Sequence, residues 1–375
     1  MNIVSESKYY DSRIKKIFTL KNNHKTSNLI ILKDENIYYL TGFYGKDSGS
    51  ILLIADDDIH LLVNFIYLER ARKSAKNKNL NIACYKKNKF GELVKILEDY
   101  SFSSIGVEGK NISLTGFRKL EKLLSGQGKK LVNIDGAVEN LRTVKDEFEI
   151  SKIKNACKIT DKVFGSIINS GAAAINKLSE IELACRIEEL LVRNNSEGRS
   201  FDIIVAYGKN SSMPHYSPQK IKVKNGLILM DFGCKFENYC SDMTRTIFTG
   251  NLKICNEFKK IYDIVLKAQQ LAIENCMEGV TCSQLDRIAR KFITSKGYGN
   301  NFGHRLGHGV GIEVHEEPAV AMDNRAVLME NMVITIEPGI YIENFGGVRI
   351  EDMVIVGKNS CEVLYNSKKS FFILD

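Results

Sequence analysis

Hydrophobic and polar positions follow two different patterns along the 375 residues of this chain. In the first 135 residues, short apolar runs bounded by turn-forming residues alternate with amphipathic stretches. The runs predict strands at residues 28–32, 37–40, 50–54 and 60–63, and the stretches predict helices at residues 90–98 and 114–124. Strands that alternate with helices are typical of an α/β layer. The N-terminal part is therefore predicted to be an α/β domain.

The pattern becomes helical from about residue 141. Asp146 can cap a helix whose apolar residues recur every three or four positions, and Ser179 can cap a second helix. A third amphipathic stretch covers residues 256–275. We expect these helices to cover the outer face of a sheet. The change of pattern places the domains at residues 1–140 and 141–375.

A pair of aspartates marks the first predicted hairpin of the second domain. Asp231 ends the apolar run 227–230, and Asp242 opens the β-rich run 243–248. Turn-forming residues lie between the two runs, so the segment is predicted to form a hairpin. Side chains opposite each other on paired strands are neighbours, and we expect the two aspartates to face each other in this way.

A pair of glutamates repeats the arrangement. Glu337 ends the run 332–336, Glu351 lies within the run 348–354, and residues 344–347 supply the turn. Like charges that oppose each other on paired strands are unfavourable. Because this occurs twice in one domain, the sequence indicates that a cation lies between the acids.

Histidines and prolines gather in the same segments. Four of the six histidines are His215, His304, His308 and His315, and each of the four prolines lies within three residues of one of them or of Glu337. A proline fixes φ and can hold a loop that carries a reacting side chain. Four acids and the neutral imidazole of His308 suit hard divalent cations better than a zinc finger. Two such cations about 3.5–4 Å apart can activate water against a peptide or phosphate bond.

The segments around these residues resemble the metal-dependent Xaa-Pro peptidases, the group that contains prolidase and aminopeptidase P. They are residues 229–233, 240–246, 303–311, 314–318, 336–339 and 348–352. The resemblance is strongest over residues 141–375. It implies a creatinase-type N-terminal domain followed in the chain by an α+β pita-bread catalytic domain, in which helices cover a curved antiparallel sheet.

The N-terminal part resembles that creatinase-type domain more weakly, through residues 39–43. Asn64 and Ile66 stand where the family often has an aspartate and an arginine. This departure leaves the role of the N-terminal domain in substrate or partner contacts open.

The resemblance implies two divalent metal ions as cofactors, manganese first, with cobalt, zinc and iron as alternatives. Their implied ligands are Asp231, Asp242, His308, Glu337 and Glu351. Asp242 and Glu351 would bridge both ions, Asp231 would bind one ion, and His308 and Glu337 would bind the other.

Further roles in catalysis and substrate binding are implied in the same way. Glu337 would also shuttle the proton of the attacking water to the leaving nitrogen. His215 and His315 would hydrogen-bond the scissile carbonyl and the oxyanion that forms. His304 and Arg349 would position the substrate, although Arg349 could equally buttress Glu351.

The implied activity is hydrolysis of the Xaa-Pro peptide bond of proline-containing di- or oligopeptides. Dipeptides are favoured because residues 303–308 look more like the dipeptidase branch. An Xaa-Pro aminopeptidase that acts on longer peptides is the alternative. A methionine aminopeptidase fits less well because that group typically lacks the N-terminal domain. A non-catalytic or metal-free relative also fits less well, because such relatives usually lose ligands. Family members are commonly dimers, so a homodimer is expected.

Composition indicates the compartment of the protein and whether a membrane association is expected. Apolar residues make up 44% of the chain and charged residues 26%, as in ordinary globular proteins. We find no apolar run near the roughly 20 residues that span a bilayer, and no signal-like start, so no membrane association is expected. Nine scattered cysteines indicate reduced thiols in a cytoplasm. Cys240, two residues before Asp242, is expected to be a packed thiol rather than a sixth ligand.

The positive net charge does not change this picture. The net charge is +8, and its densest basic stretch covers residues 70–89. Nucleic-acid-binding proteins combine such basic patches with recognisable binding motifs. No aromatic stacking motif accompanies the basic stretch, so we expect a solvated face and no nucleic-acid partner.

Overall fold

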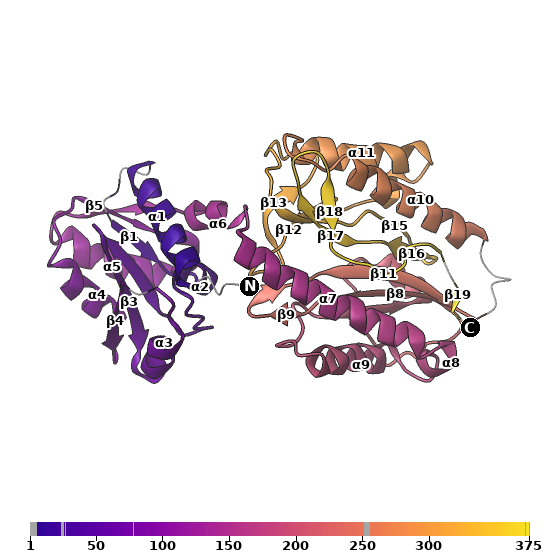
Figure 1. The fold of residues 1–375 in the computed structure, drawn as a ribbon, viewed down its shortest axis with the longest axis horizontal. Coiled ribbons are helices and arrows are strands. Elements are labelled where there is room, and N and C mark those ends of the chain that lie inside the picture. The colour runs from indigo at the N-terminus through magenta and orange to yellow at the C-terminus, as the bar shows by residue number, and fades with distance from the viewer. Residues whose placement is uncertain are drawn as a thin grey trace. The chain divides into compact units, whose positions relative to one another are not determined.

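The structure is a computed structural model that describes residues 6–23, 26, 28–77, 79–250, 256–371 and 373–374. The chain forms two compact units, residues 1–142 and 143–375 (Figure 1). The first unit is α/β and the second is α+β, which confirms the predicted fold class. Each unit is described by itself below.

The first unit is built on a six-stranded mixed sheet with the order β4-β3-β2-β1-β5-β6. β2 pairs antiparallel with β1 and β3, and the other neighbours pair parallel. The strands are β1 (Asn28–Ile31), β2 (Ile51–Ala55), β3 (Asp58–Asn64), β4 (Leu80–Tyr85), β5 (Ser104–Val107) and β6 (Lys130–Asn133). The α-helices are α1 (Ser7–Asn23), α2 (Asp34–Thr41), α3 (Leu68–Ser74), α4 (Lys89–Leu97), α5 (Leu114–Ser125) and α6 (Ala137–Arg142).

Helices α4 and α5 bury their apolar faces against this sheet. Leu97 and Leu124 belong to the same buried cluster as Ile30 and Leu53 of the sheet. Burial of such side chains is the main favourable contribution to folding. The predicted helices at residues 90–98 and 114–124 are confirmed, as are three of the four predicted strands.

The fourth predicted strand, residues 37–40, is wrong because this segment is the middle of helix α2. Asp34 and Glu35 lie in the first turn, where carboxylates favour a helix start. Gly42 ends the helix with a φ of +78°, and its N–H bonds to the Tyr38 carbonyl. Residues 36–41 are all buried, and periodicity cannot distinguish a short, wholly buried strand from a buried helix.

The second unit contains antiparallel sheets, with β11 and β19 as the one parallel pair among the described strands. A four-stranded sheet has the order β19-β11-β8-β7, a five-stranded sheet has the order β13-β12-β14-β17-β18, and β9–β10 and β15–β16 are separate hairpins. The strands are β7 (Ile204–Tyr207), β8 (Gly226–Phe232), β9 (Lys235–Phe236), β10 (Tyr239–Cys240), β11 (Met243–Thr249), β12 (Gly307–Gly309), β13 (Glu316–Val320), β14 (Val333–Ile336), β15 (Gly339–Ile342), β16 (Gly346–Arg349), β17 (Asp352–Val356), β18 (Cys361–Val363) and β19 (Ile373–Leu374).

Capping boxes begin three helices of this unit, α7, α9 and α11. The α-helices that the structure describes here are α7 (Glu147–Asn169), α8 (Ala172–Ile175), α9 (Glu180–Arg193), α10 (Asn256–Glu274) and α11 (Cys282–Ser295). Asp146 and Ser179 accept hydrogen bonds from the N3 amides of α7 and α9, and both form capping boxes. These two predicted caps are therefore confirmed. Helix α11, which Thr281 caps in the same way, was not predicted.

Helices α10 and α11 cover the five-stranded sheet. Val265 and Leu285 share one buried cluster with Ile334 and Val354 of that sheet. In the view of Figure 1, α10 and α11 run along the top of the unit and α8 and α9 along the bottom, with the strands between them. This layering agrees with the expected covering of an antiparallel sheet by helices. Among the described residues, no helix is both long and apolar enough to cross a membrane.

Packing in the second unit differs sharply between two glycine positions. Gly165 lies inside α7 with no atom near an added Cβ, whereas a Cβ on Gly233 would lie 1.8 Å from the Ser241 carbonyl oxygen. Gly165→Ala should raise the free energy of unfolding by about 0.5–1 kcal/mol through its better helix propensity. Gly233→Ala should lower it by about 1–3 kcal/mol through overpacking. Urea denaturation of both variants checks this, and equal effects would contradict the packing at Gly233.

Candidate metal centre

One cavity of about 280 Å³ in the second unit gathers all nine residues to which the sequence assigned a role. They are His215, Asp231, Asp242, His304, His308, His315, Glu337, Arg349 and Glu351. Six further residues line the same cavity: Phe201, Asp202, Ile204, Pro214, Arg305 and Val314. Segments separated by more than 100 residues therefore meet at one place.

The first acid pair is offset rather than directly opposed. Strands β8 and β11 pair with Asp231 opposite Thr244. Asp242 lies two residues before Thr244, so the expectation that the two aspartates face each other directly is wrong by two positions. The turn falls at Glu237 and Asn238, whose φ angles are 48° and 66°, and not midway between the acids. Residues two apart on a strand share a face, so Asp242 still lies on the same face as Asp231.

The second acid pair is directly opposed, as the sequence predicts. β14 pairs with β17 with Ile336 opposite Asp352. The hairpin β15–β16 continues in the same register, with Gly339 opposite Arg349. Glu337 and Glu351 therefore lie opposite each other between the end of one ladder and the start of the next.

His308 on β12 points its Nε2 atom at two of these acids. Nδ1 lies 3.1 Å from the Gly309 carbonyl oxygen, which can only accept a hydrogen bond. Nε2 lies 3.3 Å from Glu337 Oε1 and 3.6 Å from Asp242 Oδ2. A ring nitrogen between two carboxylates must share a proton or a metal ion with them.

The donor atoms lie close enough together to hold a metal ion. One ligand atom each from Asp242, His308 and Glu351 lies within 4.8 Å of the others, and all three side chains are buried. Asp231 Oδ1 is buried nearby and accepts no hydrogen bond from the described residues. An orphaned carboxylate oxygen beside a cluster of oxygen and imidazole donors fits a divalent cation.

The charges of the cavity also fit cations. Five carboxylates line the cavity against two guanidinium groups, Arg305 and Arg349. Burial raises the pKa of Asp242 and Glu351 well above its ordinary range, and the neighbouring carboxylates raise it further. Burial also raises the pKa of Asp231, against the charge of Arg349. Burial acts in the same direction on Glu337, but hydrogen bonding with His308 and nearby positive charges lower its pKa to about 2.

Arg349 is held by the protein on every side. Its Nη2 donates to Asp231 Oδ2 at 2.6 Å, its Nε donates to Thr244 Oγ1 at 2.9 Å and its Nη1 donates to the Tyr341 hydroxyl at 2.9 Å. Thr244 in turn donates to Glu351 Oε2 at 2.6 Å. These contacts favour the buttressing role of Arg349 over direct binding of a substrate carboxylate.

Three further histidines surround the metal-ligand cluster. His304 Nε2 lies 3.0 Å from the Tyr341 hydroxyl, and burial lowers the pKa of His304. The His315 ring stacks edge-on against His308 at 4.4 Å between centroids. Partial burial and the charge of His308 lower the pKa of His315 to about 4. His215 is exposed on the cavity wall.

Four residues of the site were not predicted from the sequence: Thr244, Thr335, Tyr341 and Arg305. Thr335 Oγ1 accepts from the His308 amide at 3.0 Å and donates to Glu337 Oε1 at 3.1 Å. The positions of the two threonines carry a signal, because each lies two residues from a predicted ligand on a strand and therefore shares its face. Tyr341 and Arg305 carry no such spacing signal. Cys240 donates to the Ile312 carbonyl and is not part of the cavity wall, as expected for a packed thiol.

Comparisons with known proteins agree with this geometry. The model of metallopeptidase family M24 matches residues 151–358, and the model of the creatinase/prolidase N-terminal domain matches residues 13–144. A Xaa-Pro dipeptidase from Pyrococcus horikoshii is 36% identical over 96% of this chain and 98% of its own. The resemblance inferred from the motifs is thereby confirmed.

Solved structures show the same relationship over nearly the whole chain. A Xaa-Pro dipeptidase from Bacillus anthracis has a TM-score of 0.90 at 31% identity, covering 97% of this chain and 100% of that one. An X-Pro aminopeptidase from Thermotoga maritima MSB8 has a TM-score of 0.85 at 35% identity, covering 96% of this chain and 99% of that one.

The buried carboxylates predict a stability that depends on pH and metal. The pKa of Asp242 is raised in the folded protein, so its stabilising contribution is present below the unfolded pKa and is lost as pH rises through the folded value. In a chelator at pH 7.5, Asp242→Asn should therefore raise the free energy of unfolding, on the order of 1–3 kcal/mol. The gain should shrink towards pH 4.

Denaturation curves with and without metal check this prediction. Asp263→Asn, an exposed site on α10, is the matched control and should change stability by less than about 0.5 kcal/mol. Added metal should stabilise the wild type much more than Asp242→Asn. A destabilised Asp242→Asn protein at pH 7.5 without metal would contradict the electrostatic account.

Proposed function

Since this chain belongs to metallopeptidase family M24, with a creatinase/prolidase N-terminal domain, we propose that it hydrolyses the peptide bond between a residue Xaa and proline. The observation that carries the proposal is the convergence of four acids and His308 in one buried cavity. Relatives named Xaa-Pro dipeptidase, 31–36% identical over nearly the full length, support it.

The proposed ligands of two divalent ions are Asp231, Asp242, His308, Glu337 and Glu351. Bound there, the ions would supply Lewis acidity that polarises a carbonyl and lowers the pKa of a nearby water. Manganese fits this set of oxygen and imidazole donors, and cobalt, zinc and iron are the alternatives. The ligand set separates the proposal from a non-catalytic relative, since no ligand is missing.

The proton and the oxyanion are handled by residues of the chain itself. Glu337 is ionised at neutral pH, because its pKa is about 2. We assign to this carboxylate the transfer of a proton from the attacking water to the leaving nitrogen. His315 is neutral at neutral pH because its pKa is about 4. A neutral imidazole still has one N–H group, so it can donate a hydrogen bond to the developing oxyanion. His215 is the second donor in this proposal.

A preference for dipeptides depends on which residue binds the free carboxylate of the substrate. Arg349 is buried and already bound by Asp231 and Tyr341. Arg305 is the other guanidinium of the cavity wall; it is exposed, and its side chain makes no ion pair with any residue that the structure describes. We assign the dipeptide carboxylate to Arg305, with His304 beside it. An aminopeptidase acting on longer peptides is the second candidate, supported by the X-Pro aminopeptidase relative.

The cysteines bear on the compartment in which the enzyme works. The eight cysteines that the structure describes are all free thiols, as expected in a reducing compartment, so we propose a cytoplasmic enzyme. We also propose a homodimer. Size-exclusion chromatography with light scattering tests the assembly.

Substrate length gives the decisive test of the activity. The metal-loaded enzyme should cleave Leu-Pro with a kcat/KM at least about tenfold above that for Leu-Pro-Gly, because a charged hydrogen bond to the free carboxylate is lost in the longer peptide. Arg305→Gln should bring this ratio close to one, whereas Arg325→Gln, an exposed arginine outside the cavity wall, should leave it unchanged. Faster cleavage of the tripeptide moves the assignment to an aminopeptidase, and no cleavage of any proline peptide rules out both.

His315 gives a test of the catalytic roles. His315→Ala should lower kcat by about 10²–10³, the usual effect of losing one oxyanion donor, while metal content stays at the wild-type level. Metal analysis by mass spectrometry, run beside steady-state kinetics, separates the two effects. Loss of metal with normal activity per bound ion would instead make His315 a ligand.

A further inference from the structure

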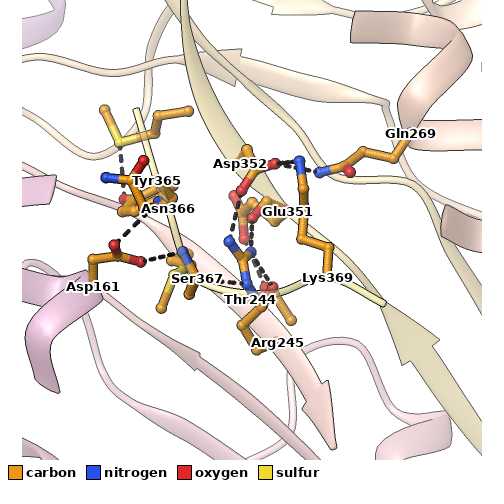
Figure 2. A network of polar contacts seen from close by, with 12 residues as sticks. Asp161, Thr244, Arg245, Gln269, Glu351, Asp352, Tyr365, Asn366, Ser367 and Lys369 are labelled. Carbon is orange, nitrogen blue, oxygen red and sulfur yellow. Dashed lines mark hydrogen bonds and ion pairs between the residues drawn. The ribbon is translucent and has the colours of Figure 1, made fainter. Parts of the chain in front are cut away.

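A polar network that includes Thr244 and Glu351 of the candidate metal centre runs through residues 364–369, here called the C-terminal strap (Figure 2). The strap follows β18 and has no regular secondary structure. Three of its side chains contact residues at or near the two carboxylates Asp242 and Glu351. Tyr365 bonds to Asp242, Ser367 bonds to Arg245, and Lys369 bonds to Asp352.

Asp242 and Glu351 adjoin different sheets, so no single ladder sets their separation. Asp242 immediately precedes β11 of the four-stranded sheet, and Glu351 immediately precedes β17 of the five-stranded sheet. Strand pairing fixes positions within a sheet only. The spacing of these two carboxylates must therefore come from contacts that cross between the sheets.

Tyr365 holds the main chain of Asp242. Its hydroxyl donates to the Asp242 carbonyl oxygen at 2.7 Å and accepts from the Asp242 N–H at 3.1 Å. The paired register of β8 and β11 begins only at Met243. The phenol thus takes the place of a strand partner for Asp242, and it is buried, so water cannot substitute for it.

Arg245 holds the main chain of Glu351 from the same network. Its Nη1 donates to the Glu351 carbonyl oxygen, and its Nη2 lies 2.7 Å from Asp352 Oδ1. The strap completes this pair from two sides: Ser367 Oγ accepts from Arg245 Nε at 3.2 Å, and Lys369 forms an ion pair with Asp352. A buried ion pair is stabilising only when its remaining donors and acceptors are satisfied. The strap contributes to this together with Gln269, whose Nε2 donates to Asp352 Oδ2 at 3.0 Å.

The strap is itself held at two points. The amides of Asn366 and Ser367 donate to the Asp161 carboxylate of α7 at 3.1 and 3.0 Å. The Lys369 carbonyl accepts from the Tyr262 hydroxyl of α10 at 2.8 Å. Helices α7 and α10 therefore both hold it.

We propose that the C-terminal strap sets the separation of Asp242 and Glu351, with Tyr365 as the positioning residue, and thereby raises the affinity of the centre for its metal ions. The inference rests on the proposed ligand roles of Asp242 and Glu351. Partners that orient metal ligands from behind affect affinity about 10- to 100-fold in known metalloproteins.

The test is metal binding by the full-length Tyr365→Phe protein, which loses one hydroxyl and keeps its ring. Calorimetric titration of the chelator-treated protein with Mn²⁺ should show an affinity about 10- to 100-fold weaker than that of the wild type. Electron paramagnetic resonance should show weaker coupling between bound Mn²⁺ ions, a signal that stability alone does not change.

Tyr239→Phe is the matched control. Tyr239 is also fully buried, and its hydroxyl bonds to Glu149 of α7, away from the strap. The two variants should lose similar stability, but Tyr239→Phe should bind Mn²⁺ as the wild type does. Equal Mn²⁺ affinities for the two variants would overturn the proposal.

Two further variants keep the result interpretable. Should Tyr365→Phe not fold, Asp161→Ala frees the strap amides at its partly exposed anchor, and it should weaken Mn²⁺ binding in the same direction; unchanged binding would again overturn the proposal. Asp242→Ala tests the premise separately. Wild-type Mn²⁺ affinity in that variant would show that the ligand set is wrong, whatever Tyr365→Phe does.

Discussion

Four carboxylates that cannot all remain charged in a buried cavity are the constraint on which the second unit depends. Asp231, Asp242, Glu337 and Glu351 share a space in which Arg349 neutralises one charge, and burial shifts the pKa of three of them upwards. Such a cluster is unstable without a cation or added protons. Divalent ions bound by the proposed ligands would resolve this conflict, so the charges that destabilise the metal-free protein would also form the metal site.

The architecture around the cluster keeps these charges in place. The proposed ligands lie at strand ends of two sheets, and polar bonds join these sheets beside the site. Thr244, Arg245 and Thr246 of β11 bond in turn to Glu351 and to the Arg349 carbonyl. Helices α10 and α11 supply the apolar covering that keeps water from competing for these bonds.

Much of this could be predicted from the sequence, because the informative residues obey short-range rules. Strand-ending acids, turn residues and helix caps located the two hairpins, α7 and α9. Two errors concern single elements. Residues 37–40 are wholly buried, so periodicity could not distinguish helix α2 from a strand. The turn lies at Glu237 and Asn238 rather than midway between the acids, so Asp231 pairs with Thr244. The bond of Arg349 to Asp231 and that of Tyr365 to Asp242 each join residues more than 100 positions apart, which local patterns do not reveal.

The place of the strap in chain order has a consequence for the comparison of this chain with its relatives. Every proposed metal ligand precedes Tyr365 in the sequence. The motifs that would bind the ions and the segment that braces two of them are therefore separate stretches of the chain. A relative could keep every motif and lose the brace, so the motifs alone would not distinguish a chain that binds its ions tightly from one that binds them weakly.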